Sequence, residues 1–296
     1  HTNSPFTRIF PDEELDAVGF VTKIHNGKIY FGTNKGLYVG NWKQQYSPLE
    51  AIDFQLVENT KGQIWGLDIV DNQLIIAHSN GAMIIKNGKA ESFFDKTGIW
   101  NFKQLSNHPE LRIAGGYFNV FLFGKENDTY KILPDFTQLN ESSRFVEEDQ
   151  KGNIWMSHPY RGIFKISPNN EFTDSKIELL GKEQGLPSYL LNHLFKINNE
   201  LIFCGESGAF TYNYESERFE EYPIFNDIFG KKNKIRRLIE TPDRNIWFVT
   251  QNEFGILEVN DKGLEKKINK IVFPFFKKEL NQGFESIYPY DEKNVF

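Results

Sequence analysis

The sequence has little of several features that identify other classes of protein. It contains a single cysteine, Cys204, so no disulfide can form within the chain. Cys204 lies in the apolar stretch LIFCGE, residues 201–206, and we expect it to be a small core residue and not a nucleophile. No apolar run reaches the about 18 residues that a membrane-spanning helix needs. The first residue is His1 and not Met, from which we expect a processed or truncated product.

Positive charge is also in deficit. The net charge is −6 and the isoelectric point is near 5.6, so the chain has no general basic field that would hold a phosphate backbone. The one strongly basic stretch, KKNKIRR at residues 231–237, is predicted to be a solvent-facing loop region. We therefore predict no nucleic-acid binding through this chain.

Sequence signals for catalysis are weak. The six histidines show no spacing typical of metal ligands, and neither a Gly-x-Ser-x-Gly motif nor a phosphate-binding loop is present. Glu147, Glu148 and Asp149 cluster in the sequence, but we expect them to face water at a turn and not to form an acid–base pair. The sequence thus predicts no catalytic residue, no metal and no cofactor.

Aromatic residues, by contrast, are abundant. The chain has 28 Phe, 12 Tyr and 5 Trp, which together make up 15% of its residues. Aromatic side chains suit the half-buried surface of a pleated sheet, so this composition favours β-strands.

A repeat organises these residues. A turn, an apolar anchor, a large residue, a polar loop and a second apolar strand recur with anchors 38 to 49 residues apart. This period suits a four-stranded antiparallel blade, with strand A, a tight turn, strand B, a polar loop, strand C, a turn and strand D. The anchors are Ile29, Leu74, Arg112, Ile154, Ile202, Ile246 and Val295.

The predicted fold is therefore an all-β propeller of four-stranded antiparallel blades, with seven blades of which the last is truncated. Residues 1–296 are predicted to form a single domain. Residues 1–10 are expected to be an outer strand that closes the ring, and residues 284–296 to begin the incomplete seventh blade. The large residues after the anchors, including Trp155 and Trp247, are predicted to pack between blades and not to hold a ligand.

Three stretches carry a family resemblance. They are EDQKGNIWMSHPYRGIFKI at residues 148–166, GKEQGLPSYLLNHLFKINNELIFCGESGAFTYN at 181–213 and TPDRNIWFVTQNEFGILEV at 241–259. They resemble the two-component-regulator propeller repeats of Bacteroidetes sensory proteins. The resemblance covers essentially the whole chain, and it is weaker in the third unit, where Arg112 replaces the usual apolar anchor.

The resemblance implies a role in signal transduction and transcription regulation. In that family the propeller is an extracytoplasmic sensor region, followed by a triple-tyrosine domain, a membrane segment and an output domain. The output is that of a hybrid two-component sensor or of a regulator with a LuxR-type DNA-binding domain. We therefore expect a periplasmic or otherwise extracytoplasmic region of a membrane-anchored protein, homodimeric in its full form. Any kinase activity would lie in a downstream domain, and this region is predicted not to be an enzyme.

A binding site is predicted from blade geometry. The loops between strands B and C, and the starts of the innermost strands, should meet at one mouth of a propeller. Aromatic faces mixed with arginine, histidine and amide groups suit an oligosaccharide or another small polar ligand. The candidate residues are Trp65, His78, Trp100, Tyr117, Arg144, His158, Tyr160, Arg161, His193, Arg237 and Gln251.

Two other function classes remain open from the sequence. One is a propeller-type carbohydrate-active enzyme, either a lyase or a hydrolase, which would need carboxylates at the mouth. The predicted loops offer only scattered ones, such as Glu206 and Glu253. The other is a protein-interaction scaffold that binds no small ligand.

Overall fold

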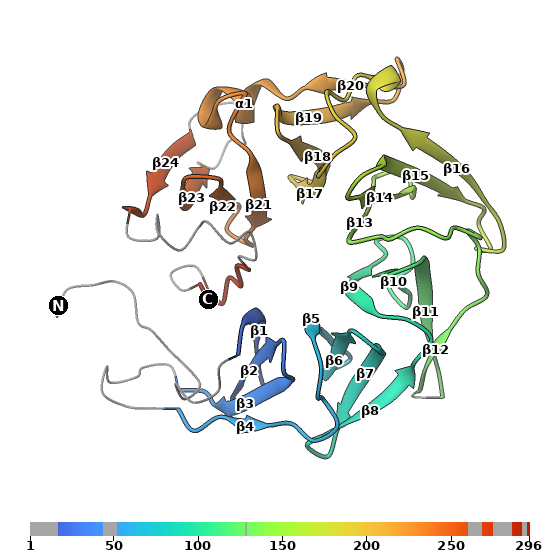
Figure 1. Ribbon diagram of the computed structural model, residues 1–296, viewed down its shortest axis with the longest axis vertical. Coiled ribbons are helices and arrows are strands. Elements are labelled where there is room, and N and C mark those ends of the chain that lie inside the picture. The colour runs from blue at the N-terminus through green and yellow to red at the C-terminus, as the bar shows by residue number, and fades with distance from the viewer. Residues whose placement is uncertain (1–16, 44–51, 128, 260–267, 275–285, 292–294) are drawn as a thin grey trace. The chain divides into compact units, whose positions relative to one another are not determined.

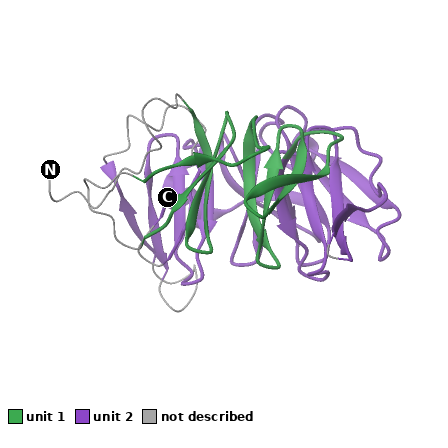
Figure 2. Ribbon diagram, turned by 90° about the horizontal axis from the view of Figure 1, so that it is seen from below, with its two compact units in different colours: residues 1–99, 296 green, residues 100–295 purple. Residues whose placement is uncertain are grey.

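The computed structural model describes residues 17–43, 52–127, 129–259, 268–274, 286–291 and 295–296 (Figure 1). The chain divides into two compact units, residues 1–99 together with residue 296, and residues 100–295 (Figure 2).

In its described residues, unit 1 contains two four-stranded antiparallel sheets, each built from strands that are consecutive in the chain. The first sheet comprises β1 (Gly19–His25), β2 (Lys28–Thr33), β3 (Leu37–Asn41) and β4 (Gln55–Leu56). The second comprises β5 (Ile64–Val70), β6 (Gln73–His78), β7 (Gly81–Lys86) and β8 (Lys89–Phe94).

The described part of unit 2 contains four sheets of the same kind. In Figure 1 their first strands lie on the inside of the unit and their last strands on the outside. The third sheet comprises β9 (Ile99–Gln104), β10 (Arg112–Gly116), β11 (Val120–Glu126) and β12 (Thr129–Ile132). The fourth comprises β13 (Phe145–Glu148), β14 (Ile154–His158), β15 (Gly162–Pro168) and β16 (Ser175–Leu180). The fifth comprises β17 (His193–Ile197), β18 (Glu200–Gly205), β19 (Gly208–Asn213) and β20 (Arg218–Glu221). The sixth comprises β21 (Ile235–Glu240), β22 (Ile246–Thr250), β23 (Phe254–Val259) and β24 (Ile268–Val272).

The tight turns between the first and second strands follow from their residue types. In the first sheet Asn26 and Gly27 both adopt positive φ, 49° and 69°, and in the fifth sheet Asn198 and Asn199 do the same at 50° and 63°. Two consecutive positive φ values are typical of the type I′ hairpin, for which Asn and Gly are the favoured residues. These two turns therefore fix the register of their hairpins from the sequence.

The predicted blade pattern is confirmed for the six sheets. The anchor residues of β2, β6, β10, β14, β18 and β22 are all buried, with Ile29, Ile154 and Ile202 at 0% exposure. The chain is thus an all-β propeller of four-stranded antiparallel blades, six of which lie in the described residues.

The seventh blade stays a prediction. In its expected place the described residues show a single antiparallel bridge between Pro289 and Val295, and Ile287 packs against the sixth blade beside Trp247. The ring-closing outer strand, predicted at residues 1–10, lies outside the described residues. The prediction that residues 1–296 form one domain also stays a prediction.

The cores lie between neighbouring blades. Trp155, on β14, is fully buried and meets the rings of Phe203 and Tyr212 from the fifth blade at 5.1 and 4.9 Å. Trp247 is 8% exposed and packs in the sixth blade. The prediction that both tryptophans are core residues is confirmed, as is the burial of Cys204 at 1% exposure.

The acidic cluster before Trp155 does not face water as the sequence suggested. Glu148 and Asp149 are each 4% exposed, and Glu147 forms an ion pair with Lys103 at 2.5 Å. Asp149 Oδ2 accepts hydrogen bonds of 2.7 Å from both Trp155 Nε1 and the Tyr214 hydroxyl. A buried carboxylate with this many donors is satisfied where it lies, and it joins the fourth blade to the fifth.

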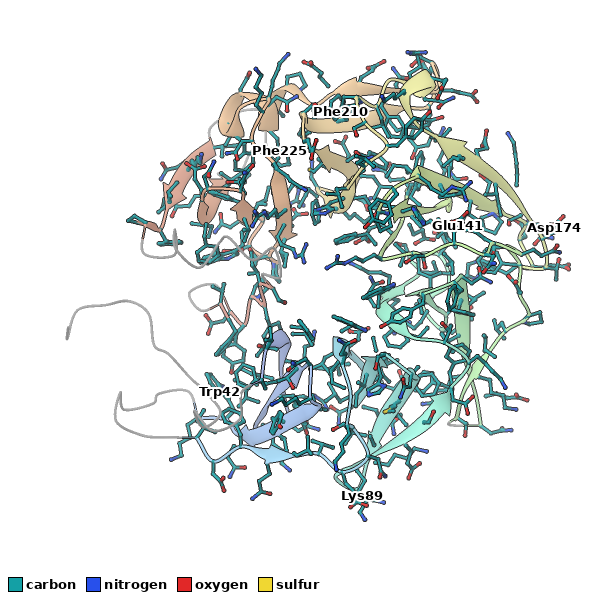
Figure 3. All side chains as sticks on the ribbon, in the orientation of Figure 1. Trp42, Lys89, Glu141, Asp174, Phe210 and Phe225 are labelled. Carbon is teal, nitrogen blue, oxygen red and sulfur yellow. The ribbon has the colours of Figure 1, made fainter. Side chains whose placement is uncertain are left out.

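One helix was missed by the sequence pattern. Helix α1 (Pro223–Phe229) follows β20 and buries Phe225, labelled in Figure 3, together with Asn226 and Phe229. The Asn226 side chain donates to Ala209 O and accepts from Ala209 N at 3.0 and 2.8 Å, so it continues the blade edge. Two turns are too short to show a helical period. Within the described part of the chain, no helix has the length and apolarity needed to cross a bilayer.

Candidate functional site

A cavity lies along the inner strands of unit 2. It has a volume of about 740 Å³, within the range of small-molecule sites. Its walls come from β9, β13, β17 and β21 and from the turns that follow β17 and β21. Its polar, charged and aromatic lining residues include Asn101, Lys103, Phe145, Glu147, Lys196, Arg237, Glu240 and Arg244.

A stack of rings and guanidinium groups runs from this cavity toward the loops between second and third strands. Phe145 lies at its centre, with the His193 ring 4.8 Å away and tilted by 31°. The Cζ atoms of Arg144 and Arg237 lie 5.9 and 5.6 Å from the centre of the same Phe145 ring.

Two further aromatic residues extend the stack on the side of Arg144. Its Cζ atom lies 5.7 Å from the centre of the Trp100 ring, and Trp100 in turn meets Tyr117 at 4.6 Å with an interplanar angle of 39°. We call this set the inner-wall cluster: Trp100, Tyr117, Arg144, Phe145, His193 and Arg237. All six side chains are half-buried, so each keeps some surface for a ligand.

Arg144 is held in place by its neighbour Ser143, which is fully buried. The Ser143 hydroxyl accepts from Gly116 N at 2.7 Å and donates to Asn119 O at 2.7 Å, which attaches this loop to the third blade. Asn101 Nδ2 donates to the carbonyl of Arg144 at 2.6 Å. The backbone that carries the guanidinium is therefore fixed from both sides.

A β-bulge on β21 positions the Arg237 side chain. On β21, Ile235 pairs with Thr250 while Arg237 pairs with Val249, so Arg236 is the extra residue. A bulge bends the strand and redirects the side chains beside it, and bulges are frequent near binding sites. Here the redirected guanidinium approaches Phe145.

The pKa of His193 reflects its burial and the positive charges of this wall. Burial, with further contributions from the positive charges of Arg237, Lys234 and Arg144, lowers the pKa of His193 from 6.5 to about 3. The imidazole is therefore neutral at ordinary pH. Nδ1 lies 3.3 Å from Arg236 O, so it carries the proton and donates to that carbonyl, which leaves Nε2 as an acceptor.

The far end of the cavity lies at the hairpin turns, which are bonded to one another. Gln150 Nε2 donates to Asn199 O at 3.0 Å, joining the turns of the fourth and fifth blades. Asn198 N donates to Glu240 Oε2 at 2.6 Å, joining the fifth blade to the sixth. These bonds stabilise the spacing of the inner strands and thus the width of the cavity.

The structure brings five of the predicted candidates together, namely Trp100, Tyr117, Arg144, His193 and Arg237. Their role in binding stays a prediction. Of these, only Arg237 lines the cavity itself.

Three other candidates form a separate group around Glu141, whose position is labelled in Figure 3. His158 Nε2 lies 3.3 Å from Glu141, and Arg161 forms an ion pair with the same carboxylate. Tyr160 is 70% exposed and meets the edge of the His158 ring.

The remaining candidates lie elsewhere. In unit 1 His78 is 1% exposed, with Nε2 bonded to Lys61 O and Nδ1 accepting from Asn80 N, so it is not available to a ligand in this structure. Trp65 stacks on Phe20 at 4.7 Å within unit 1. Gln251 is exposed in unit 2 and its backbone N–H bonds Lys234 O.

Sequence reasoning missed Phe145, Asn101 and Lys196. They lie inside the innermost strands, where the alternation of side chains points every second residue inward. That alternation is the signal that could have identified them, because lining residues such as Phe145 and Glu147 lie two positions apart on one strand.

The sequence matches no protein-family model and no curated protein. Solved structures, however, show the fold. The chain is similar to the extracellular domain of a hybrid two-component system of B. thetaiotaomicron, with 15% identity and a TM-score of 0.59. That match covers 90% of this chain and 34% of the other, so the chain spans about a third of that domain's length.

Two other propellers are similar to about the same degree. Virginiamycin B lyase from Staphylococcus aureus has 12% identity and a TM-score of 0.58, covering 89% of this chain and 87% of the lyase. The C-terminal WD40 domain of Sif2 has 8% identity and a TM-score of 0.56, covering 88% and 72%. A sensor, a lyase and a WD40 domain share this fold, so the fold alone assigns no function.

Proposed function

We propose that this chain is the ligand-sensing propeller of an extracytoplasmic region in a bacterial signal-transduction protein that regulates transcription. Its ligand is a glycan or another small polar nutrient, and its site is the inner-wall cluster with the adjoining cavity. The observation that carries the proposal is the stack in which Arg144 contacts both Trp100 and Phe145. The fold shared with the extracellular domain of a two-component system supports it.

The chemistry of the cluster suits such a ligand. Sugar rings present C–H faces that pack on aromatic rings and hydroxyl groups that form hydrogen bonds. Trp100 and Tyr117 offer the faces, the two arginines offer donors, and Asn101 Oδ1 and His193 Nε2 offer acceptors.

Signalling would follow from a population shift. A ligand changes the output only if it binds one arrangement of propeller and partner domains more tightly than another. The hydrogen bonds between neighbouring hairpin turns make the blades of unit 2 stiff, which favours reorientation of whole domains over a change within a blade. The partners we propose are the downstream triple-tyrosine and output domains of the same membrane-anchored chain and a second copy of the full protein.

The test is a ligand screen on the purified chain. Thermal shift with a panel of glycans and small polar nutrients should give at least one compound that raises the melting temperature, and calorimetry should then measure its affinity. Trp100→Ala should abolish the shift, while Tyr160→Ala, a matched aromatic truncation on the separate group around Glu141, should retain it. A flat response of the wild-type chain to the whole panel would contradict the proposal.

The enzyme alternative concerns the same cavity. A propeller-type lyase or hydrolase would place free carboxylates there, whereas Glu147 and Glu240 each form an ion pair with a lysine or arginine of the wall. The sensor is therefore the better-supported proposal for this region. Incubation with each ligand found in the screen, followed by chromatography of the products, separates the two: cleavage of the ligand would favour the enzyme.

A scaffold that binds only proteins is the third class. Phe118 and Tyr160 are 61% and 70% exposed in unit 2, and such residues suit protein contacts. Retention of partner binding by Trp100→Ala together with a flat ligand screen would favour it.

A further inference from the structure

The cavity wall carries more positive than negative charge. Of its ionisable residues, Lys103 pairs with Glu147 at 2.5 Å and Arg244 pairs with Glu240 at 2.9 Å. Both carboxylates of the wall are thus already occupied. Lys196 has only a long contact of 3.5 Å to the Ser106 hydroxyl, and no carboxylate of the described residues lies within 4 Å of its ammonium group.

Two guanidinium groups lie close together beside this wall. Arg144 and Arg237 lie within 6 Å of the same ring, Phe145. In the part of the chain that the structure describes, no carboxylate lies within 4 Å of Arg144, whose contacts are to rings. Burial lowers the pKa of Arg144, because the charged guanidinium group has lost part of its hydration. A bound anion would offset this loss of hydration.

Hydrogen-bond acceptors lie beside the charges. Asn101 Oδ1 is buried and has no donor among the described residues, while its Nδ2 is committed to the Arg144 carbonyl. His193 Nε2 is a second acceptor. An inorganic anion such as sulfate has no hydroxyl that could donate to these atoms, so the wall is built for a ligand that carries both an acid group and hydroxyl groups.

We propose that the inner-wall cluster recognises an acidic saccharide, with its carboxylate held by Arg144 and Arg237. The planar guanidinium groups match a carboxylate in geometry and can bind it through two hydrogen bonds each. The sugar ring packs on Trp100 and Tyr117, and its hydroxyls donate to Asn101 and His193. Lys196 supplies the positive charge for a second acidic unit along the cavity. This proposal rests on the proposed sensing function and adds the charge class of the ligand.

The experiment compares acids with their own methyl esters by calorimetry. The probes are oligosaccharides of galacturonic acid and of glucuronic acid, the same compounds with methyl-esterified carboxylates, and the neutral galactose and glucose counterparts. At least one acid should bind the wild-type chain, and its ester should bind about tenfold or more weakly, because esterification removes the negative charge and keeps the sugar ring and its hydroxyls. Affinity for the acid should fall as salt rises.

Variants locate the site. Arg144→Gln and Arg237→Gln should each weaken binding of the acid by about tenfold or more, and should bring the acid and its ester to similar affinity. The matched control is Arg218→Gln, which removes an exposed arginine of the outer strand β20 and should leave the affinity unchanged. The melting temperature of each variant without ligand checks that it folds.

The outcomes separate the two proposals. An ester or neutral sugar that binds as tightly as the acid overturns the acidic class and leaves the sensing function standing. Binding of an acid that neither Arg144→Gln nor Arg237→Gln weakens overturns the site. If no acid binds while another compound of the broader screen does, only the acidic class fails; if the whole screen is flat, both proposals fail.

Discussion

Trp155 and Asp149 are joined by a buried hydrogen bond of 2.7 Å from Nε1 of the indole to Oδ2 of the carboxylate. Asp149 Oδ2 also accepts a hydrogen bond from the Tyr214 hydroxyl of the fifth blade. The carboxylate therefore links Trp155 of the fourth blade to the fifth blade. Trp155 is thus a structural residue of the scaffold on which the inner-wall cluster is built.

Removing the Asp149 carboxylate should destabilise the propeller. Asp149→Ala leaves the indole N–H and the tyrosine hydroxyl without their acceptor, and each unsatisfied buried group costs about 1–3 kcal/mol. Tyr214→Phe removes one donor and should cost about 1 kcal/mol. Urea denaturation of the two single variants and the double variant measures the coupling, and strictly additive effects would contradict the shared network.

Alkaline pH should act on the same network. Burial and the hydrogen bond to Asp149 raise the pKa of Tyr214 above its ordinary value of 10.0. Unfolded Tyr214 loses its proton near pH 10 while the folded residue keeps it, so this contribution to stability is complete below pH 10 and is lost as pH rises above it. The melting temperature measured from pH 9 upward should fall less steeply in Tyr214→Phe than in the wild-type chain.

Acid should act through His193. Its pKa is about 3 in the folded chain against an ordinary 6.5, so the unfolded chain takes up a proton that the folded chain refuses between these values. The contribution is complete above pH 6.5 and is lost as pH falls toward 3, with a slope of at most about 1.4 kcal/mol per pH unit. His193→Asn should flatten the stability profile over this range. An unchanged profile would contradict the lowered pKa of His193 in the folded chain.

A substitution at Gly115 tests how the Ser143–Arg144 loop is attached to the third blade. A Cβ atom at Gly115 would lie 2.0 Å from the carbonyl oxygen of Ser143, so Gly115→Ala must push the Ser143–Arg144 loop away. We expect a loss of stability of about 1–3 kcal/mol or more and weaker ligand binding. The control is Gly124→Ala in the same blade, where the nearest atom is the flexible end of Leu111 at 3.3 Å. Equal melting temperatures of the two variants would contradict the attachment.

The blade architecture could be predicted from the sequence because its signals are local. Anchors such as Ile154 and Ile202 recur at blade spacing, and turns such as Asn26-Gly27 define some of the hairpins. The family resemblance added an expected role, which the shared fold supports only in its coarse form.

The site was less accessible to sequence reasoning, for physical reasons. His78 has the residue type of a ligand contact, but a carbonyl and an amide from its own blade satisfy both ring nitrogens. Asp149 is buried because donors 6 and 65 residues away converge on it. The approach of Arg237 to Phe145 depends on a bulge that no composition or period encodes.

The most direct test of the proposed site is a crystal structure of the chain with the tightest-binding saccharide of the screen. We predict electron density for the sugar against Trp100 and Tyr117, with its acid group within hydrogen-bond distance of Arg144 and Arg237. A saccharide bound instead at the group around Glu141, with the inner-wall cluster unoccupied, would contradict it.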